Sequence, residues 1–211
     1  MPLYICRRTA GEIEIDGLLN EESWRRADPA AFRLHDDSAP PPLITIARLC
    51  YDDTCLYVAF ECEDTEIEAK LTRRDDPIFD EEVVEIFLDA DSDGLTYYEF
   101  EVSPLNTIFD GLVRNPTGVK GEIDTSWDCD GLRTAVSRGR SGDESWSVEM
   151  AIPFASLPGA PNTPPKPGDR WRMNLYRIER APREEYICWS PTRQSPANYH
   201  APAMFGTVEF G

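Results

Sequence analysis

Carboxylates alternate with apolar and aromatic side chains along two neighbouring segments, 83–89 and 97–103, which a short Asp-Ser-Asp-Gly stretch separates. A period of two is typical of strands, and a short turn between two strands predicts a hairpin. The hairpin would place four acidic residues on one face: Glu85, Asp89, Glu99 and Glu101. Like charges that face each other across strands destabilise the pair. This face therefore requires some compensation. The acidic surplus of the whole chain fits cation binding, hydrogen bonding to neutral polar ligands such as sugars, or solubility alone.

The opposite face of the same two segments is apolar. We expect five of its side chains to point into the core: Val84, Ile86, Leu88, Phe100 and Val102. Both strands should then be half-buried, with acids and aromatic residues on the outer face. A slip of one residue would invert every side chain, so this register is a sharp prediction.

The stretch between the two predicted strands begins like a calcium-binding loop. Asp89, Asp91, Asp93 and Gly94 stand at the first, third, fifth and sixth positions of an EF-hand. A complete EF-hand also needs a glutamate at the twelfth position and helices on both sides, but Phe100 occupies that position. An acidic hairpin turn is the simpler interpretation, and the three aspartates remain candidate metal ligands.

Two of the acids on the predicted hairpin also allow a catalytic interpretation. Glycosidases use two carboxylates about 5 Å apart for retention or about 6.5 to 9.5 Å apart for inversion, and Glu85 with Glu101 could form such a pair. The alternative is a binding face without turnover. Serine or cysteine hydrolase chemistry has little support, because the chain has two histidines, His35 and His200, and no Gly-x-Ser-x-Gly motif. Glycosidase domains are also usually larger than this chain, so these residues give catalysis little support.

Composition and charge restrict the possible partners. The chain has 211 residues, a length that fits one domain, and we expect a single domain over residues 1–211. The net charge of −18 disfavours nucleic acid and anionic membrane surfaces, since both are bound through clusters of Lys and Arg. No stretch is apolar enough for a transmembrane helix, and the first residues lack the apolar centre of a signal peptide. The compartment stays open on these grounds.

Six cysteines are present: Cys6, Cys50, Cys55, Cys62, Cys129 and Cys188. Their spacing contains no paired Cys-x-x-Cys motif, which disfavours a zinc site. Three of them lie in or beside apolar segments, so buried free thiols and disulfides are both open interpretations.

Segments with strand character recur along the whole chain, separated by turn signals such as Asp-Asp-Thr and Gly-Arg-Ser-Gly-Asp-Glu-Ser. We expect strands at 13–15, 43–50, 55–63, 83–89, 97–103, 132–138, 145–152, 172–179, 186–189 and 207–210. One short helix should begin after Asn20 as its N-cap, with Trp24 facing the core, and a helical turn should follow Pro153. This pattern predicts an all-β fold: an antiparallel β-sandwich with jelly-roll or immunoglobulin-like layering and one short N-terminal helix.

An ordered set of motifs extends over nearly the whole chain. They read IDGLLNEESWRRAD, CYDDTCLYVAFECED, DEEVVEIFLDADSDGLTYYEFEVSP, SWSVEMAIPFASL, GDRWRMNLYRIER, WSPT and HAPAMFGTVEF. In this order they resemble the family 9 carbohydrate-binding modules. The resemblance implies a non-catalytic β-sandwich that binds a saccharide as an accessory to a glycoside hydrolase in polysaccharide degradation. It also implies structural calcium and no organic cofactor. It also suggests a secreted or periplasmic protein.

The resemblance further implies where the sugar would lie. In that family two aromatic side chains hold a sugar ring, and the matching positions here look like Phe79 and Tyr199. The carboxylate that accepts hydrogen bonds from sugar hydroxyls falls on Glu85, while a basic residue of the next strand is replaced near Glu101. Additional candidate ligand-binding residues lie in or beside the loop that follows the 186–189 segment: Trp189, Gln194 and Asn198.

Two other functions remain open. His200 and Met204 are the usual types of haem axial ligand, which would suggest electron transfer, but residues four apart cannot readily reach opposite faces of one haem. Alternatively the chain is a degenerate module that acts as a structural or protein-interaction domain, because Phe79 and Tyr199 differ from the tryptophans that the family uses.

Overall fold

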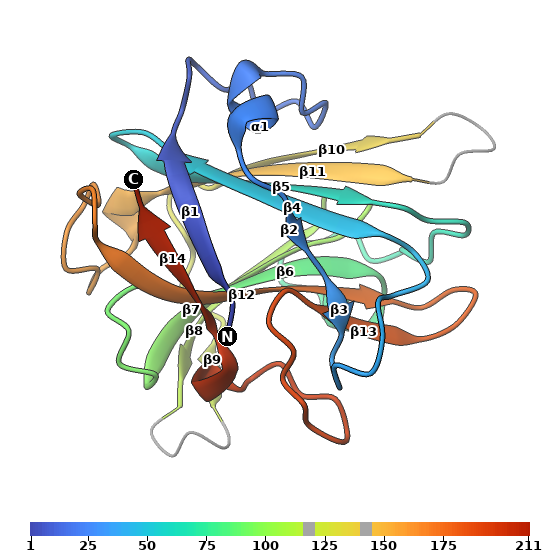
Figure 1. Ribbon diagram of the computed structural model, residues 1–211. Coiled ribbons are helices and arrows are strands. Elements are labelled where there is room, and N and C mark those ends of the chain that lie inside the picture. The colour runs from blue at the N-terminus through green and yellow to red at the C-terminus, as the bar shows by residue number, and fades with distance from the viewer. Residues whose placement is uncertain (116–120, 140–144) are drawn as a thin grey trace.

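The computed structural model describes residues 1–115, 121–139 and 145–211 and consists of two β-sheets packed face to face (Figure 1). The predicted all-β sandwich with one short N-terminal helix is confirmed. In chain order the elements are β1 (Leu3–Arg8), α1 (Glu22–Arg26), β2 (Ala30–Ala31), β3 (Arg33–Leu34), β4 (Thr45–Tyr51), β5 (Cys55–Cys62), η1 (Ile78–Asp80), β6 (Val83–Asp89), β7 (Thr96–Val102), β8 (Ile108–Arg114), β9 (Glu122–Asp124), β10 (Arg133–Arg138), β11 (Trp146–Pro153), η2 (Phe154–Ser156), β12 (Arg170–Glu179), β13 (Glu185–Cys188), η3 (Pro202–Met204) and β14 (Gly206–Phe210).

The strand order divides the molecule into its two layers. One layer contains β10-β11-β5-β4 and the other contains β14-β12-β6-β7-β8-β9. Strand β1 connects them, because it pairs with β4 on one side and with β14 on the other. Both of these pairings are parallel, whereas the other pairings within the described residues are antiparallel.

The predicted register of the β6–β7 hairpin is confirmed. The main core between the sheets contains the five side chains that the alternation placed there: Val84, Ile86, Leu88, Phe100 and Val102. Glu85 is paired directly with Glu101 across the two strands, so the two acids lie on the same outer face. The hairpin loop at 90–95 is flanked by strands and not by helices, in agreement with the rejection of an EF-hand.

The expectation that β6 and β7 are half-buried is wrong, because their outer face is covered too. Phe87 and Tyr97 on that face belong to a second apolar cluster, to which the C-terminal segment contributes Tyr199 and Phe205. The acids between them are consequently buried, and Glu85 is only 2% exposed. A segment about one hundred residues further along the chain supplies this cover, which the local alternation does not reveal.

The N-terminal region differs from the prediction in two details. The helix begins one residue later than expected, so Glu21 and not Asn20 occupies the N-cap position, and no side chain caps it. Residues 13–15 form no strand, although Ile13 is buried. Trp24 is buried as predicted, and its indole nitrogen donates to Glu149 Oε1 at 2.7 Å, which holds the helix on the outer face of β4, β5 and β11.

Five strands escaped prediction: β1, β2, β3, β8 and β9. The middle of β8 carries Asp110-Gly111, a pair typical of turns. In the structure Asp110 Oδ2 accepts a hydrogen bond from the backbone nitrogen of Cys129 at 2.6 Å, and a Cβ at Gly111 would lie 2.8 Å from Ile123 Cγ2. Asp110 and Gly111 therefore serve tertiary contacts in the middle of a strand and do not form a turn.

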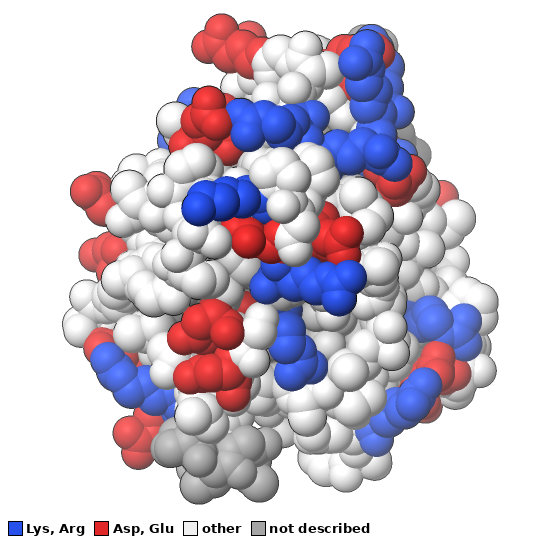
Figure 2. All heavy atoms as spheres, turned by 60° about the vertical axis from the view of Figure 1, so that its left-hand side comes forward, with Lys and Arg blue, Asp and Glu red and all other residues white. Residues whose placement is uncertain are grey.

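The surface carries many charged side chains, as the composition indicates. Basic and acidic side chains lie next to one another on the face drawn in Figure 2. No helix in the described ranges is long and apolar enough to cross a bilayer.

All six cysteines are buried free thiols, which decides between the two interpretations that the sequence left open. A 3-10 turn follows Pro153 as predicted, whereas most of the predicted Gly-Arg-Ser-Gly-Asp-Glu-Ser turn lies outside the described residues.

Candidate functional site

A pocket of about 320 Å³ opens on the outer face of β6 and β7. Its floor consists of Glu85 and Phe87 from β6 together with Glu99 and Glu101 from β7. Strand alternation explains this set, because residues two apart project to the same face. The walls come from the 3-10 turn at Phe79, the end of β12, Tyr186 of β13 and the segment 197–200.

Three carboxylates meet in the pocket floor. One oxygen each of Glu85, Glu99 and Glu101 lies within 4.8 Å of the other two, and the three residues are only 2%, 3% and 1% exposed. Both oxygens of Glu101 and one oxygen each of Glu85 and Glu99 have no hydrogen-bond donor among the described residues. With an effective dielectric constant of about 20, two unit charges at such a distance repel by roughly 3 kcal/mol.

Burial is the main cause of the altered acidity of these groups. It raises the pKa of Glu85 and of Glu101 well above the usual range, and repulsion from neighbouring carboxylates adds to the effect. The pKa of Glu99 rises to about 7, again through burial. In the absence of a bound cation or hydrogen-bond donors, the cluster consequently retains protons near neutral pH.

Phe79 provides an accessible aromatic surface at the rim. It is 40% exposed, and its ring meets that of Phe109 edge to face, with centroids 6.0 Å apart. Arg180 donates to the backbone oxygen of Phe79 at 2.6 Å and pairs with Glu184. Its guanidinium group also lies over the ring of Tyr186, 5.7 Å from the centroid. These contacts fix the backbone of the rim, where the exposed Phe79 lines the pocket.

Tyr199 lies in the pocket wall, but it is almost fully buried. Its hydroxyl donates to the backbone oxygen of Arg177 at 2.8 Å and accepts from the backbone nitrogen of Ile187 at 2.9 Å. Its ring stacks on Tyr176, with centroids 4.0 Å apart. With 7% exposure, Tyr199 contributes an edge and not an open platform.

The residues beside Tyr199 supply polar groups to the same wall. Asn198 Oδ1 accepts a hydrogen bond from the backbone nitrogen of His200 at 3.0 Å. His200 Nδ1 and the Tyr97 hydroxyl are 2.8 Å apart, and burial lowers the pKa of His200 to about 4. Met204 does not line this pocket, so the structure does not bring the two haem-type residues together there.

The structure thus brings together five of the predicted site residues in one pocket: Phe79, Glu85, Glu101, Asn198 and Tyr199. Trp189 lies elsewhere, because its ring belongs to the main core and meets Tyr4 edge to face at 6.4 Å. Gln194 does not line the pocket either. The ligand-binding role of all these residues stays a prediction.

The predicted metal ligands in the hairpin loop do meet, as carboxylate oxygens of Asp89, Asp91 and Asp93 lie within 4.8 Å of one another. One oxygen of each aspartate accepts a hydrogen bond from the loop itself, while Asp89 Oδ1 is buried without a donor. Asp93 Oδ1 accepts from the backbone nitrogens of Leu95 and Thr96, and Asp89 Oδ2 accepts from that of Gly94. These hydrogen bonds hold the loop as an acidic hairpin turn, and a metal-binding role of the three aspartates stays a prediction.

Sequence reasoning missed several lining residues. Glu99 was placed on the acidic face but not in the site, although its spacing of two from Glu101 could have indicated it. Arg180 supplies a basic side chain from the end of β12, whereas the family resemblance points to the second strand of the hairpin for one. The sequence suggested His200 only for haem ligation or hydrolase chemistry and not for this pocket. For Arg180 and His200 the local sequence holds no signal, because their position depends on how distant segments pack.

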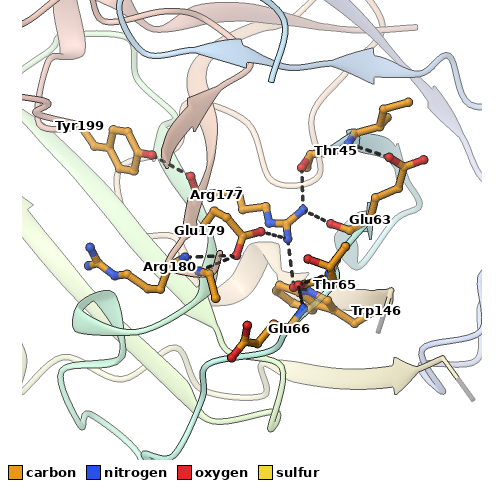
Figure 3. Close-up of polar contacts among 12 residues, drawn as sticks. Thr45, Glu63, Thr65, Glu66, Trp146, Arg177, Glu179, Arg180 and Tyr199 are labelled. Carbon is orange, nitrogen blue, oxygen red and sulfur yellow. Dashed lines mark hydrogen bonds and ion pairs between the residues drawn. The ribbon is translucent and has the colours of Figure 1, made fainter. Parts of the chain in front are cut away.

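Behind the pocket, β12 carries a buried ionic network on its other face (Figure 3). Arg177 is fully buried and pairs with Asp64 at 3.1 Å and with Glu179. It also donates to the hydroxyl of Thr45 at 3.2 Å and to the backbone oxygen of Glu63 at 2.7 Å. Because residues alternate along the strand, Ile178 and Arg180 face the pocket while Arg177 and Glu179 face the interior.

Comparison with known sequences identifies one family. The family model for carbohydrate-binding family 9 matches residues 35–210. An extracellular protein of Arthroderma benhamiae is 30% identical over 191 residues, a match that covers 82% of this chain and 81% of that protein. Exoglucanase XynX of Acetivibrio thermocellus is 25% identical over 159 residues, which cover 74% of this chain but only 13% of the exoglucanase.

Solved structures show the same fold. A structure described as a carbohydrate-binding protein from Bacteroides uniformis has a TM-score of 0.80 at 15% identity and covers 99% of both chains. A family 9 module from Caldicellulosiruptor kristjanssonii in complex with cellotriose has a TM-score of 0.71 at 18% identity, covering 99% of this chain and 93% of that one. Its complex with glucose has a TM-score of 0.67 at 18% identity, with coverage of 98% and 95%.

Proposed function

Since the chain belongs to carbohydrate-binding family 9, we propose that the pocket on β6 and β7 binds a mono- or oligosaccharide. The observation that carries this proposal is the exposed ring of Phe79 beside a floor of carboxylates that lack hydrogen-bond donors. A pyranose has apolar C–H faces and a hydroxyl edge, so an aromatic ring and charged acceptors in one pocket match both of its surfaces.

Within this pocket the predicted residues have different roles. The Phe79 ring stacks on one face of the sugar. Glu85 and Glu101 accept hydrogen bonds from its hydroxyls, and Asn198 adds an amide at the rim. Tyr199 shapes the wall with little accessible surface, because it is 7% exposed and Tyr176 stacks on one face of its ring. The site therefore relies on one open aromatic platform in place of a pair.

The binding role is proposed as non-catalytic. A retaining glycosidase needs one ionised carboxylate and one protonated partner, kept apart in acidity by different surroundings. Here burial raises the pKa of all three floor carboxyls, and the three share one environment. An accessory role beside a glycoside hydrolase outside the cell is supported by the names of the two relatives, an extracellular protein and an exoglucanase.

The test is a calorimetric titration of glucose and cellotriose against wild type and Phe79→Ala. Loss of the stacking ring should weaken binding by about 1–3 kcal/mol, or roughly 5- to 150-fold. Leu95→Ala removes a side chain of similar exposure, 47%, that does not line the pocket, and should bind as wild type does. Equal affinities of wild type and Phe79→Ala would contradict the site, and absence of binding by wild type would favour the degenerate module.

A further inference from the structure

The pocket floor combines three buried acids with an opening to solvent. We propose that a divalent cation, Ca²⁺, binds between Glu85, Glu99 and Glu101, and that saccharide hydroxyls complete its coordination. The coordination of the ion by saccharide hydroxyls rests on the proposed function, whereas the calcium site itself is argued from the carboxylates. Saccharide binding would then depend on calcium.

The spacing of the carboxylates fits one ion. Calcium ligands lie 2.3–2.6 Å from the ion, so two oxygens on the same ion are at most about 5.2 Å apart. The oxygens of Glu85, Glu99 and Glu101 lie within 4.8 Å of one another. Three carboxylates can supply up to six of the six to eight oxygens that calcium takes, and the pocket leaves space for hydroxyl groups at the remaining positions.

The unpartnered atoms point to a missing cation. Glu101 is 1% exposed and shares a hydrogen bond with Glu99 when one of the two carboxyls is protonated. Both oxygens of Glu101 and one oxygen each of Glu85 and Glu99 lack any other donor among the described residues. Buried charges are normally paired or bound to metal. Arg180 is the one Lys or Arg side chain among the described lining residues, and it is engaged by Glu184 and by the backbone of Phe79. Asp80 adds a further negative charge at the rim.

The other acidic clusters of the described chain differ in this respect. The cluster of Asp64, Glu82 and Glu179 contains Arg177, and that of Asp75, Asp110 and Asp128 contains Arg74. The buried carboxylate of the cluster around Glu149 accepts three hydrogen bonds from the N-terminal region. The hairpin-loop cluster accepts backbone hydrogen bonds. Among the described residues, the pocket floor has no paired Lys or Arg and no amide donor at both oxygens of Glu101 or at one oxygen each of Glu85 and Glu99, although both oxygens of Glu82 and Asp89 Oδ1 also lack a donor in the other clusters.

The experiment titrates Ca²⁺ into the chelator-treated chain by calorimetry, for wild type, Glu99→Gln, Glu101→Gln and the control Asp91→Asn. Ligand charge sets calcium affinity, so each glutamine variant should bind Ca²⁺ at least about 10-fold more weakly, while the control should keep wild-type affinity. Both glutamine variants remove like-charge repulsion and should unfold, in chelator, at a temperature equal to or above that of wild type. Calcium should raise the unfolding temperature of wild type but not of the glutamine variants.

The same samples are then titrated with glucose and cellotriose, in calcium and in chelator. Saccharide binding by wild type should weaken at least about 10-fold in chelator, since the ion holds the hydroxyl edge. Calcium binding lost only in Asp91→Asn, or absent from wild type, would overturn the cation site. Saccharide binding of equal strength in calcium and chelator would overturn its role in recognition. Absence of saccharide binding in both media would instead refute the proposed function, while the calcium titration still decides the cation site.

Discussion

Tyr199 stacks on Tyr176 with ring centroids 4.0 Å apart and an interplanar angle of 12°. The Tyr199 hydroxyl lies between β12 and β13, where it donates to the backbone oxygen of Arg177 and accepts from the backbone nitrogen of Ile187. Tyr199 therefore bridges the two strands and forms part of the structure that supports the pocket. Its contribution to binding can be separated from its contribution to folding only by a conservative substitution.

Tyr199→Phe should lower the free energy of unfolding by about 1–3 kcal/mol, because the backbone nitrogen of Ile187 loses its buried acceptor. The ring stack on Tyr176 would be kept, so saccharide affinity should change little. Denaturant unfolding and calorimetry measure the two effects. Tyr186→Phe is the control, since the Tyr186 hydroxyl bonds the partly exposed side chains of Arg180 and Glu184. A loss no larger than that of the control would show that the bridge contributes little.

Arg177→Met should lower the free energy of unfolding by about 3–5 kcal/mol, because removing one partner of a buried ion pair leaves the other charge uncompensated. Asp64 and Glu179 are both fully buried beside the guanidinium group. Arg170→Met provides a matched control, since Arg170 is 66% exposed and its pair with Glu209 should contribute about 0–1 kcal/mol. Similar losses for the two variants in urea unfolding would contradict a structural role of the buried network.

Glu82 predicts a pH dependence of stability. Burial and a hydrogen bond with Glu179 raise the pKa of Glu82 to about 9, above its unfolded value of 4.5. The stabilisation from the protonated carboxyl is therefore complete below the unfolded pKa and is lost as the pH rises through the folded pKa. For one proton the loss is at most about 1.4 kcal/mol per pH unit.

Glu82→Gln imitates the protonated carboxyl and tests this dependence. The variant should match wild type near about pH 4 and exceed its unfolding free energy near about pH 9, where wild-type Glu82 loses its proton. Glu122→Gln changes an exposed acid and should follow wild type at both pH values. Urea unfolding across this range is the measurement. Parallel pH profiles of wild type and Glu82→Gln would show that Glu82 does not titrate in this window.

The alternation of residues 83–89 and 97–102 was sufficient to predict the hairpin, its register and the shared face of Glu85 and Glu101. These features depend on side chains two residues apart and on a turn of a few residues, so the local sequence determines them. Phe79 precedes β6 by a few residues in the chain, so its location at the start of that strand also follows from the sequence. The family resemblance then predicted the sandwich, and the saccharide site that it places around these residues stays a prediction.

Other features were decided by the tertiary structure. Trp189 and Tyr199 stand ten residues apart in one segment, yet Trp189 lies in the main core and Tyr199 in the pocket wall. Arg180 reaches the pocket because β12 ends beside Phe79, and the outer face of β6 is buried because the segment around Phe205 folds over it. Such contacts join residues about one hundred positions apart. Their burial depends on how whole strands and loops pack, which no local pattern of polar and apolar residues specifies.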